Sequence, residues 1–224
     1  MTELEALKNR HSVRAYQERK IEQEVANQLK AFLDACNQKG NVHLELAEDA
    51  GGTFGSIFNW GRGLASAPSA IVCMGPDDDT LDERVGYYGE QAVLFAQQLG
   101  LNTCWVGMFQ TKGVPVTIPK GERLVLVIAL GYGKDAGKPH KSKTPEQVSF
   151  CETEAPEWFR YGVELALLAP TAINQQKFEF RYLSDGSVSA KAFAGPFSKV
   201  DLGIVKYHFD LGRAEHGQKE TFFA

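Results

Sequence analysis

Two arginines, a serine and a histidine lie within five residues of one another near the start of the chain. The segment Arg10-His-Ser-Val-Arg14 places two guanidinium groups, a hydroxyl and an imidazole where a short helix is expected to end. These groups offer several hydrogen-bond donors, and guanidinium pairs well with phosphate. The segment therefore suits a polyanionic or carbonyl-rich ligand, with a solvated basic turn as the alternative.

A second basic cluster follows much later in the chain. The segment Lys138-Pro-His-Lys-Ser-Lys143 carries lysines, which act as point charges suited to a phosphate whose position is fixed by other groups. Taken alone, this segment also fits a surface linker.

Two further segments combine a strand with small or amide residues. Pro170-Thr-Ala-Ile-Asn-Gln-Gln176 runs from a helix-ending proline to the start of a predicted strand. Its amides suit the donor and acceptor edge of a heterocycle, or else they cap the turn. Trp105-Val-Gly107 ends another predicted strand with a glycine, which allows a flat ligand to approach the backbone closely or forms a simple β-bulge.

Amphipathic helices and apolar strands must position these segments. Thr2 and Glu5 can form a capping box on the first helix, and Gly100 is well placed to end the long central one. Hydrophobic periodicity predicts helices at about 2–9, 22–36, 88–99 and 157–168, and strands at 42–46, 69–74, 103–107, 123–130 and 178–182.

Composition excludes several classes of function. The chain has 224 residues and a formal net charge of −4, without a basic block that would neutralise a run of nucleic-acid phosphates. No segment approaches the ~20 apolar residues of a membrane span, and no signal peptide is apparent. The four cysteines form no CxxC pair. We therefore expect a cytoplasmic protein with reduced, mostly buried thiols, no metal site, and neither nucleic acid nor membrane as a partner.

The two halves of the chain have similar patterns. Aligning residues 25–46 with 159–180 pairs helix with helix, turn with turn and strand with strand, without a gap. Likewise, Gly89 and Phe95 have the same spacing as Gly203 and Phe209. A duplicated unit explains this, with chance similarity of amphipathic elements as the alternative. We place the first repeat at 1–150 and a shorter second repeat at 151–224.

Taken together, these segments resemble the flavin-dependent nitroreductase family. Arg10-His-Ser-Val-Arg14, Leu99-Gly-Leu-Asn-Thr-Cys-Trp-Val-Gly107, Ile128-Ala-Leu-Gly-Tyr132 and Lys141-Ser-Lys143 occur in that family's order and near its spacing. Ala169-Pro-Thr-Ala-Ile-Asn-Gln-Gln176 is similar to its Ala-Pro-Ser-x-x-Asn-x-Gln motif. The resemblance covers most of the chain and implies an α+β fold, with a mixed sheet wrapped by helices and two intertwined unequal repeats.

One departure from the family pattern concerns the position of the Ala-Pro-Ser motif. In the usual family member it follows the first basic motif, a place that Ala35-Cys-Asn-Gln-Lys-Gly40 occupies here, and the second half lacks an Arg-x-Ser-x-Arg segment. The usual family builds two FMN sites across a homodimer interface. Two repeats with complementary losses resemble the single-chain branch of the family, which implies a monomer that acts as a pseudo-dimer with one site.

Carried over by position, the resemblance implies a flavin site with residues from both repeats. The pyrimidine, ribityl and phosphate region would contact Arg10, His11, Ser12 and Arg14, with Lys141 and Lys143 completing the phosphate contacts. The flavin ring would contact Asn59 and the strand end formed by Trp105, Val106 and Gly107. The Gly107 N–H would lie near flavin N5. The other side of the ring would contact Pro170, Thr171, Ala172 and Asn174.

The function implied is that of an FMN-dependent oxidoreductase. It would transfer hydride from NAD(P)H through the flavin to a nitroaromatic, quinone or similar small acceptor, with no catalytic acid, base or nucleophile from the protein. A flavin-binding protein without turnover, such as a reservoir or sensor, is the first alternative. A phosphate-binding interaction module without flavin is the second.

Overall fold

The computed structural model describes residues 1–50, 52–54 and 64–223. Contacts between Cα atoms divide the chain into two compact units, one made of 1–81 and 91–139, the other of 82–90 and 140–224. These compact units do not correspond to the proposed sequence repeats at 1–150 and 151–224. The repeat boundary at residue 150 therefore stays a prediction.

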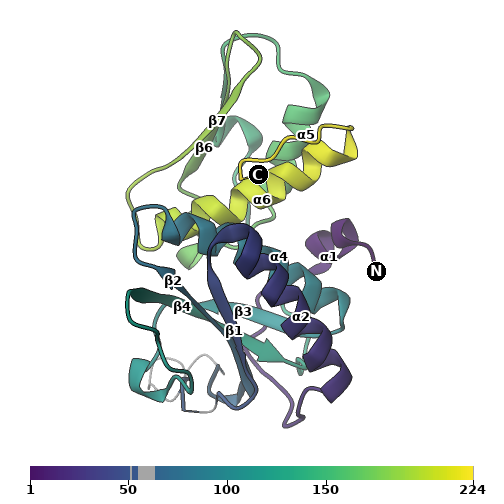
Figure 1. Ribbon diagram of the computed structural model, residues 1–224. Coiled ribbons are helices and arrows are strands. Elements are labelled where there is room, and N and C mark those ends of the chain that lie inside the picture. Colours follow the sequence, from purple (N-terminus) through teal and green to yellow (C-terminus); the bar gives the residue numbers. More distant parts are fainter. Residues whose placement is uncertain (51, 55–63, 224) are drawn as a thin grey trace. The chain divides into compact units, whose positions relative to one another are not determined.

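A four-stranded antiparallel sheet forms the centre of the first unit (Figure 1). Its order is β1-β2-β4-β3. The strands pair in register along their length, apart from one irregularity in β2 between Cys73 and Met74. They span β1 (His43–Ala47), β2 (Ser69–Pro76), β3 (Asn102–Val106) and β4 (Glu122–Gly131).

Helices cover one face of this sheet, and a hydrophobic core lies on the other. Helix α2 (Gln23–Gly40) buries Ala26, Leu29, Leu33 and Cys36 at helical spacing, and Phe32 stacks on Phe95 with ring centroids 4.2 Å apart. The opposite face contributes alternate residues of each strand to a buried cluster, including Val72, Val127, Cys104 and Val106. Helix α1 (Glu3–Asn9) precedes α2 and the sheet in the chain, and its predicted capping box is confirmed.

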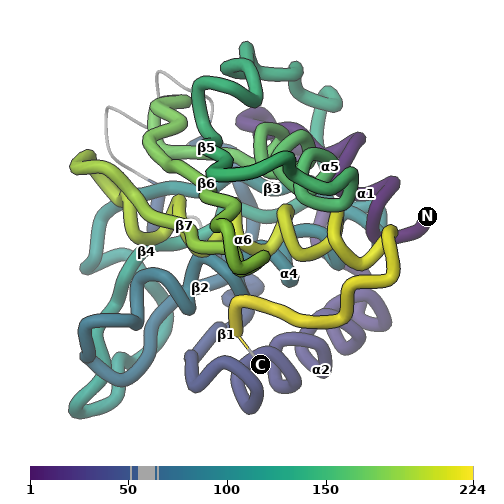
Figure 2. The backbone as a smooth tube through the Cα atoms, turned by 90° about the horizontal axis from the view of Figure 1, so that it is seen from above, coloured from purple at the N-terminus to yellow at the C-terminus, as the bar shows by residue number. Residues whose placement is uncertain are grey.

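The second unit combines a small mixed sheet with two packed helices. Strand β5 (Ser149–Cys151) runs parallel to β6 (Phe178–Tyr182), which pairs antiparallel with β7 (Val188–Ala192). Helices α5 (Glu157–Ala166) and α6 (Ser198–Glu215) lie side by side in both views (Figure 2). Phe180 of the sheet stacks on Phe209 of α6 at 4.5 Å, so an aromatic core joins the two layers.

Two glycines allow helix α4 (Leu81–Gln98) to cross α6 within the second unit. A Cβ at Gly86 would lie 2.0 Å from the Val200 carbonyl oxygen, and one at Gly203 would lie 1.9 Å from that of Glu83. The helices can therefore approach this closely only without side chains at these positions. This contact does not test the proposed equivalence of Gly89 and Gly203 in the two repeats, and the duplication stays a prediction.

The α+β fold with mixed sheet pairing is confirmed, but several bounds differ from the sequence expectation. Helix α4 begins seven residues before Tyr88, because Leu81 and Val85 continue its buried face and acidic residues occupy its first turn. Helix α2 continues past Cys36 to Gly40, where Asn41 takes the left-handed conformation that ends it. Three of the four free cysteines are buried as expected, and Cys151 is exposed.

Candidate functional site

The segment from Arg10 to Arg14 lies beside strand β3 in the first unit. Arg10 is the C-cap of α1 and has extended backbone angles, so the chain leaves the helix straight. Ser12 forms a parallel bridge with Thr103, and the Val13 N–H donates to the Thr103 carbonyl at 3.0 Å. The structure therefore brings the first basic motif to the edge of the strand that carries Trp105.

Buried groups on both sides fix this segment. The Tyr16 hydroxyl donates to the Val13 carbonyl at 2.8 Å, and the Tyr16 ring is fully buried in the core. Gly137 has a φ of +72°, and a Cβ there would lie 2.8 Å from the His11 Cβ. Residues near the sheet thus set the backbone position of the motif.

The polar side chains of the motif differ in exposure. Arg10 is 7% exposed, while Arg14 is exposed and its Nη1 donates to the Ser12 carbonyl at 3.3 Å. The His11 Nδ1 is buried and has no hydrogen-bond partner among the described residues. A buried ring nitrogen without a partner is unfavourable, so this atom is suited to a ligand donor or acceptor.

The end of β3 supplies the third set of predicted residues. Cys104 and Val106 point into the core, and strand alternation turns Trp105 to the other face, where it is half-buried. The strand ends at Val106, one residue earlier than expected, and Gly107 begins the following bend. Asn59, the predicted contact to the flavin ring, lies outside the described residues.

In the second unit, the lysine segment and the amide loop form one hydrogen-bonded structure centred on Gln176. Its Oε1 accepts from the Lys143 N–H at 2.8 Å, and its Nε2 donates to the Lys141 carbonyl at 2.9 Å. The Lys143 ammonium in turn donates to the Gln176 carbonyl at 2.6 Å. Since Gln176 is only 3% exposed, these bonds fix both segments relative to each other.

The loop at 170–176 contains the remaining predicted residues. Pro170 and Thr171 precede a single turn at Ala172–Asn174, and the Thr171 hydroxyl accepts from the Gln176 N–H at 3.1 Å. The Asn174 Nδ2 donates to the Lys141 carbonyl at 2.9 Å, and its Oδ1 accepts from the Gln176 Nε2 at 2.9 Å. Asn174 thus has local partners for both ends of its amide.

Asp201, in the first turn of α6, anchors this loop and was not among the residues predicted from sequence. Its Oδ1 accepts from the Ala172 N–H at 2.9 Å, and its Oδ2 accepts from the Gln175 Nε2 at 2.7 Å. Burial raises the pKa of Asp201 to about 6, against the opposing effect of these hydrogen bonds. The only sequence signal was an acidic residue in the first turn of a helix, which does not identify its partners.

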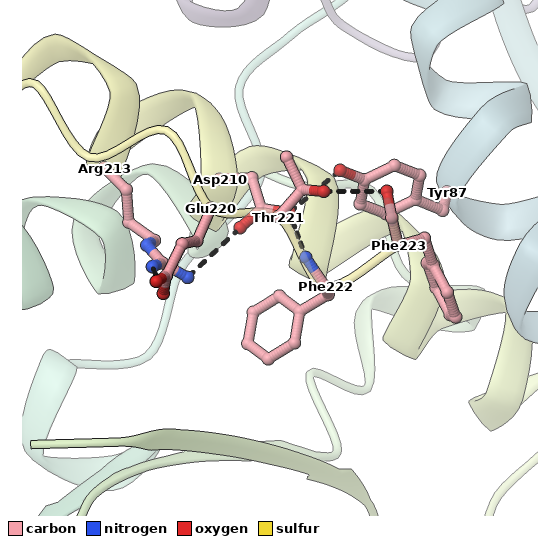
Figure 3. A network of polar contacts seen from close by, with 7 residues as sticks. All are labelled: Tyr87, Asp210, Arg213, Glu220, Thr221, Phe222 and Phe223. Atoms are coloured by element: carbon pink, nitrogen blue, oxygen red, sulfur yellow. Dashed lines mark hydrogen bonds and ion pairs between the residues drawn. The ribbon is translucent and has the colours of Figure 1, made fainter. Parts of the chain in front are cut away.

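A separate buried network holds the C-terminal segment in place within the second unit (Figure 3). The Tyr87 hydroxyl and the Phe222 N–H both donate to the Asp210 Oδ2, at 2.8 and 2.9 Å. Burial raises the pKa of Asp210, and it raises that of Tyr87 together with the neighbouring carboxylate. Phe222 packs against Phe209, so this network serves the aromatic core and contains none of the predicted site residues.

Comparison with known proteins identifies the family. Residues 3–213 match the model of a family described as putative TM nitroreductase. The chain belongs to this family. Nitroreductases are oxidoreductases, and membership supports an oxidoreductase activity for the chain. No curated protein matches the chain.

Solved structures of nitroreductases share this fold. A putative nitroreductase from Thermotoga maritima is 25% identical, with a TM-score of 0.69 over 96% of this chain and 85% of that one. A nitroreductase family protein from Clostridium difficile is 21% identical, with a TM-score of 0.52 over 69% of this chain and 100% of that one. A protein from Parabacteroides distasonis named as a putative NADH dehydrogenase/NAD(P)H nitroreductase is 21% identical, with a TM-score of 0.51 over 65% of this chain and 95% of that one.

Among the described residues, no helix combines the length and apolar character needed to cross a membrane. Within the same residues, no group of three or more histidine, cysteine, aspartate or glutamate side chains is arranged to hold a metal ion.

Proposed function

We propose that this chain is an FMN-dependent oxidoreductase that takes hydride from NAD(P)H and reduces a nitroaromatic, quinone or similar small acceptor. The observation that carries the proposal is the family match over residues 3–213, within which the Arg10–Arg14 segment has the residue types of the family's flavin motif. The solved relative named as an NAD(P)H nitroreductase supports the choice of donor.

The first unit fits FMN in its donor chemistry. The His11 Nδ1 is buried without a described partner, and it belongs to a segment that also presents the Ser12 hydroxyl and the exposed Arg14 guanidinium. These groups are suited to a flavin's carbonyl-rich ring edge, ribityl chain and phosphate. When bound, FMN would supply a two-electron carrier between the nicotinamide and the second substrate.

In this proposal the chain's own residues bind and orient. Arg10 and Arg14 would neutralise the phosphate with help from Lys141 and Lys143, and the backbone of Trp105, Val106 and Gly107 would support the ring, with the Gly107 N–H as a donor to it. Pro170, Thr171, Ala172 and Asn174 would hold the ring from its other side, and Asn59 would be a further contact to it. No side chain acts as an acid, base or nucleophile in the hydride step.

Removal of the arginines tests the phosphate contacts. Arg10→Ala and Arg14→Ala should each weaken FMN binding by a few kcal/mol, because each removes a charge-assisted hydrogen-bond donor. Lys20→Ala is the matched control, since Lys20 is exposed and lies outside the motif. Titration of apoprotein with FMN, followed by flavin fluorescence, measures the effect. Equal affinity in all three variants would place the phosphate elsewhere, and recovery of FAD from purified protein would contradict the FMN assignment.

We also propose that a single chain supplies all of these residues and that the protein works as a monomer. Mixing Arg14→Ala protein with Asn174→Ala protein tests this. If one chain forms the site, the mixture stays as defective as its components. Recovery of FMN binding after confirmed subunit exchange would instead show that two chains share a site, as in the usual homodimer.

Turnover distinguishes the enzyme from a flavin reservoir or sensor. Protein loaded with FMN should oxidise NADH or NADPH in the steady state when a quinone or nitroaromatic is present. Binding of FMN without such oxidation, across several acceptors, would support the binding protein instead.

A further inference from the structure

The loop that contains Asn174 has an unusual backbone. Ile173, Asn174 and Gln176 have φ values of 49°, 55° and 45°, all in the left-handed region. This region is unfavourable for side chains in general and most of all for a β-branched residue such as Ile173. Ile173 is also 81% exposed, so its own packing does not compensate. Contacts elsewhere must hold the loop in this conformation.

Asp201 makes the contacts that hold the first half of this loop. Its two carboxylate oxygens accept from the Ala172 N–H and the Gln175 Nε2, on either side of Ile173 and Asn174. The Gln175 Nε2 also donates to the Pro196 carbonyl at 2.8 Å, which identifies that atom as the nitrogen of the amide. Every partner of Asp201 in this loop is thus a donor, so the ionised carboxylate, which has two acceptor oxygens and no proton, matches these partners better than the protonated acid does.

The ionised carboxylate is not explained by global stability. Asp201 is 6% exposed, and burial raises its pKa to about 6 from a usual value of 3.8. The other causes of this shift are the hydrogen bonds from Gln175 and Ala172, both uncharged. The folded protein therefore binds a proton at Asp201 more tightly than the unfolded chain does, and ionisation at neutral pH opposes folding. A buried charge that opposes folding yet fixes a strained loop indicates a role in function.

We infer that Asp201 is a positioning residue for the cofactor, whose carboxylate holds the backbone of Ala172, Ile173 and Asn174 in the conformation that contacts FMN. This inference rests on the proposed function. It adds to that function a residue from a different helix, which does not itself need to contact the flavin.

The test compares Asp201→Asn with the wild-type protein. The amide keeps the size of the side chain but replaces one of the two acceptor oxygens with an NH2 group, so a donor then faces the donors of Ala172 and Gln175 and their contacts are weakened. We expect FMN affinity at pH 8 to fall on the order of tenfold or more. The difference between the two proteins should shrink as the pH falls below 6, because wild-type Asp201 is then protonated and likewise presents a donor on one of its two oxygens. Asp185→Asn is the control, since Asp185 is an exposed aspartate of the same unit whose carboxylate accepts from the Ser187 N–H and hydroxyl.

Two measurements without flavin complete the test. Hydrogen exchange of the amides at 171–176 should be faster in apo Asp201→Asn than in apo wild type, while the urea midpoint at pH 8 should be unchanged or higher. A purely structural role predicts a lower midpoint. If Asp201→Asn does not fold, Gln175→Met provides a second test. It removes the Gln175 Nε2 that donates to Asp201, and it should lower FMN affinity in the same way.

The outcomes separate the inference from the function on which it rests. Failure of wild-type protein to bind FMN would overturn the proposed function, and the inference with it. Binding of FMN by wild type with equal affinity in Asp201→Asn would overturn the inference alone. Weaker FMN binding with unchanged loop exchange would also overturn it, because Asp201 would then act by some route other than the loop.

Discussion

The segments between helix and strand in the two units have nearly equal lengths but different structures. In the first unit, β1 begins 20 residues after the start of α2, from Gln23 to His43. In the second, β6 begins 21 residues after the start of α5, from Glu157 to Phe178. Helix α2 uses 18 of its residues, whereas α5 uses 10. The second unit therefore has a long loop where the first has two more turns of helix.

A proline accounts for much of this difference. In the first unit, Ala35-Cys-Asn-Gln-Lys-Gly40 contains no helix breaker before its final glycine, so the helix continues to Gly40. In the second unit, Pro170 has no N–H to donate and disfavours helical geometry at Ala169. The helix has already ended at Ala166.

Side chains take over the hydrogen bonding that the helix would have provided. In the first unit, one residue joins the helix end to the strand: the Asn37 amide exchanges two bonds with the backbone of Leu44, at 2.7 and 3.1 Å. In the second, Gln176, Asn174 and Asp201 hold the loop at several points. A shortened helix leaves polar backbone groups whose position must be fixed by side chains, and such loops commonly carry recognition.

Among the differences between the two segments, we expect the largest effect on stability to be its pH dependence due to Asp201. Its pKa is about 6 in the folded protein, against a usual 3.8. Between these values the folded state holds a proton that the unfolded chain has released, so stability falls as the pH rises from about 4 to 6. We expect wild type to lose roughly 3 kcal/mol relative to Asp201→Asn over this range and nothing further above pH 7.

Urea denaturation of both proteins from pH 4 to 8 measures this difference. The raised pKa of Asp210 is common to both proteins and cancels. A flat difference, or one that rises with pH, would mean that Asp201 is stabilised by its hydrogen bonds more than it is penalised by burial.

Removal of Gln176 should have the next largest effect. Gln176→Ala deletes three side-chain hydrogen bonds, to Lys143, Lys141 and Asn174, at a buried position. We expect the free energy of unfolding to fall by about 2 to 3 kcal/mol. Gln38→Ala is the matched control, because Gln38 lies exposed in the corresponding part of α2. Its effect should lie within about 0.5 kcal/mol. Similar losses in both variants would remove the contrast between the two segments.

The smallest effect concerns the left-handed residues of the two segments. Ile173→Gly should raise the free energy of unfolding by about 1 kcal/mol, because glycine adopts a φ of 49° without strain and the isoleucine side chain is exposed. Asn41→Gly should change it by only a few tenths of a kcal/mol, since asparagine tolerates the φ of 45° at the end of α2. Thermal unfolding of wild type and both variants measures these changes in stability. Destabilisation by Ile173→Gly would show that the loop holds no strain at this residue.

Hydrophobic patterns predicted the fold better where burial is regular. Strand β6 has the bounds expected from Phe178-Glu-Phe-Arg-Tyr182, because its alternation is strong. Strand β7 was not predicted: its residues alternate between exposed and half-buried, and Val188-Ser-Ala-Lys-Ala192 has little apolar content. Strand β5 has three residues and exists through its pairing with β6, which no local pattern reveals.

The candidate site was predictable in its residue types but not in its supports. The segments around Arg10, Lys141 and Asn174 were readable because they concentrate polar groups or follow a proline. The structure adds two contacts between distant parts of the chain. Asp201 accepts from the N–H of Ala172, 29 residues earlier, and Gln176 accepts from the N–H of Lys143, 33 residues earlier. A single sequence does not encode such partners in any local pattern.

The helix crossing in the second unit limits how this sequence can drift. The atoms that exclude a side chain at Gly86 and Gly203 are main-chain carbonyls, so no substitution elsewhere can make room for one. At Gly100 the space is open, and only the φ of +80° restricts the residue, which asparagine or aspartate can adopt. If every glycine is randomised and folded variants are selected, only glycine should be recovered at Gly86 and Gly203, whereas glycine, asparagine and aspartate should be recovered at Gly100. The two glycines of the crossing would then help to recognise distant relatives whose other residues have diverged.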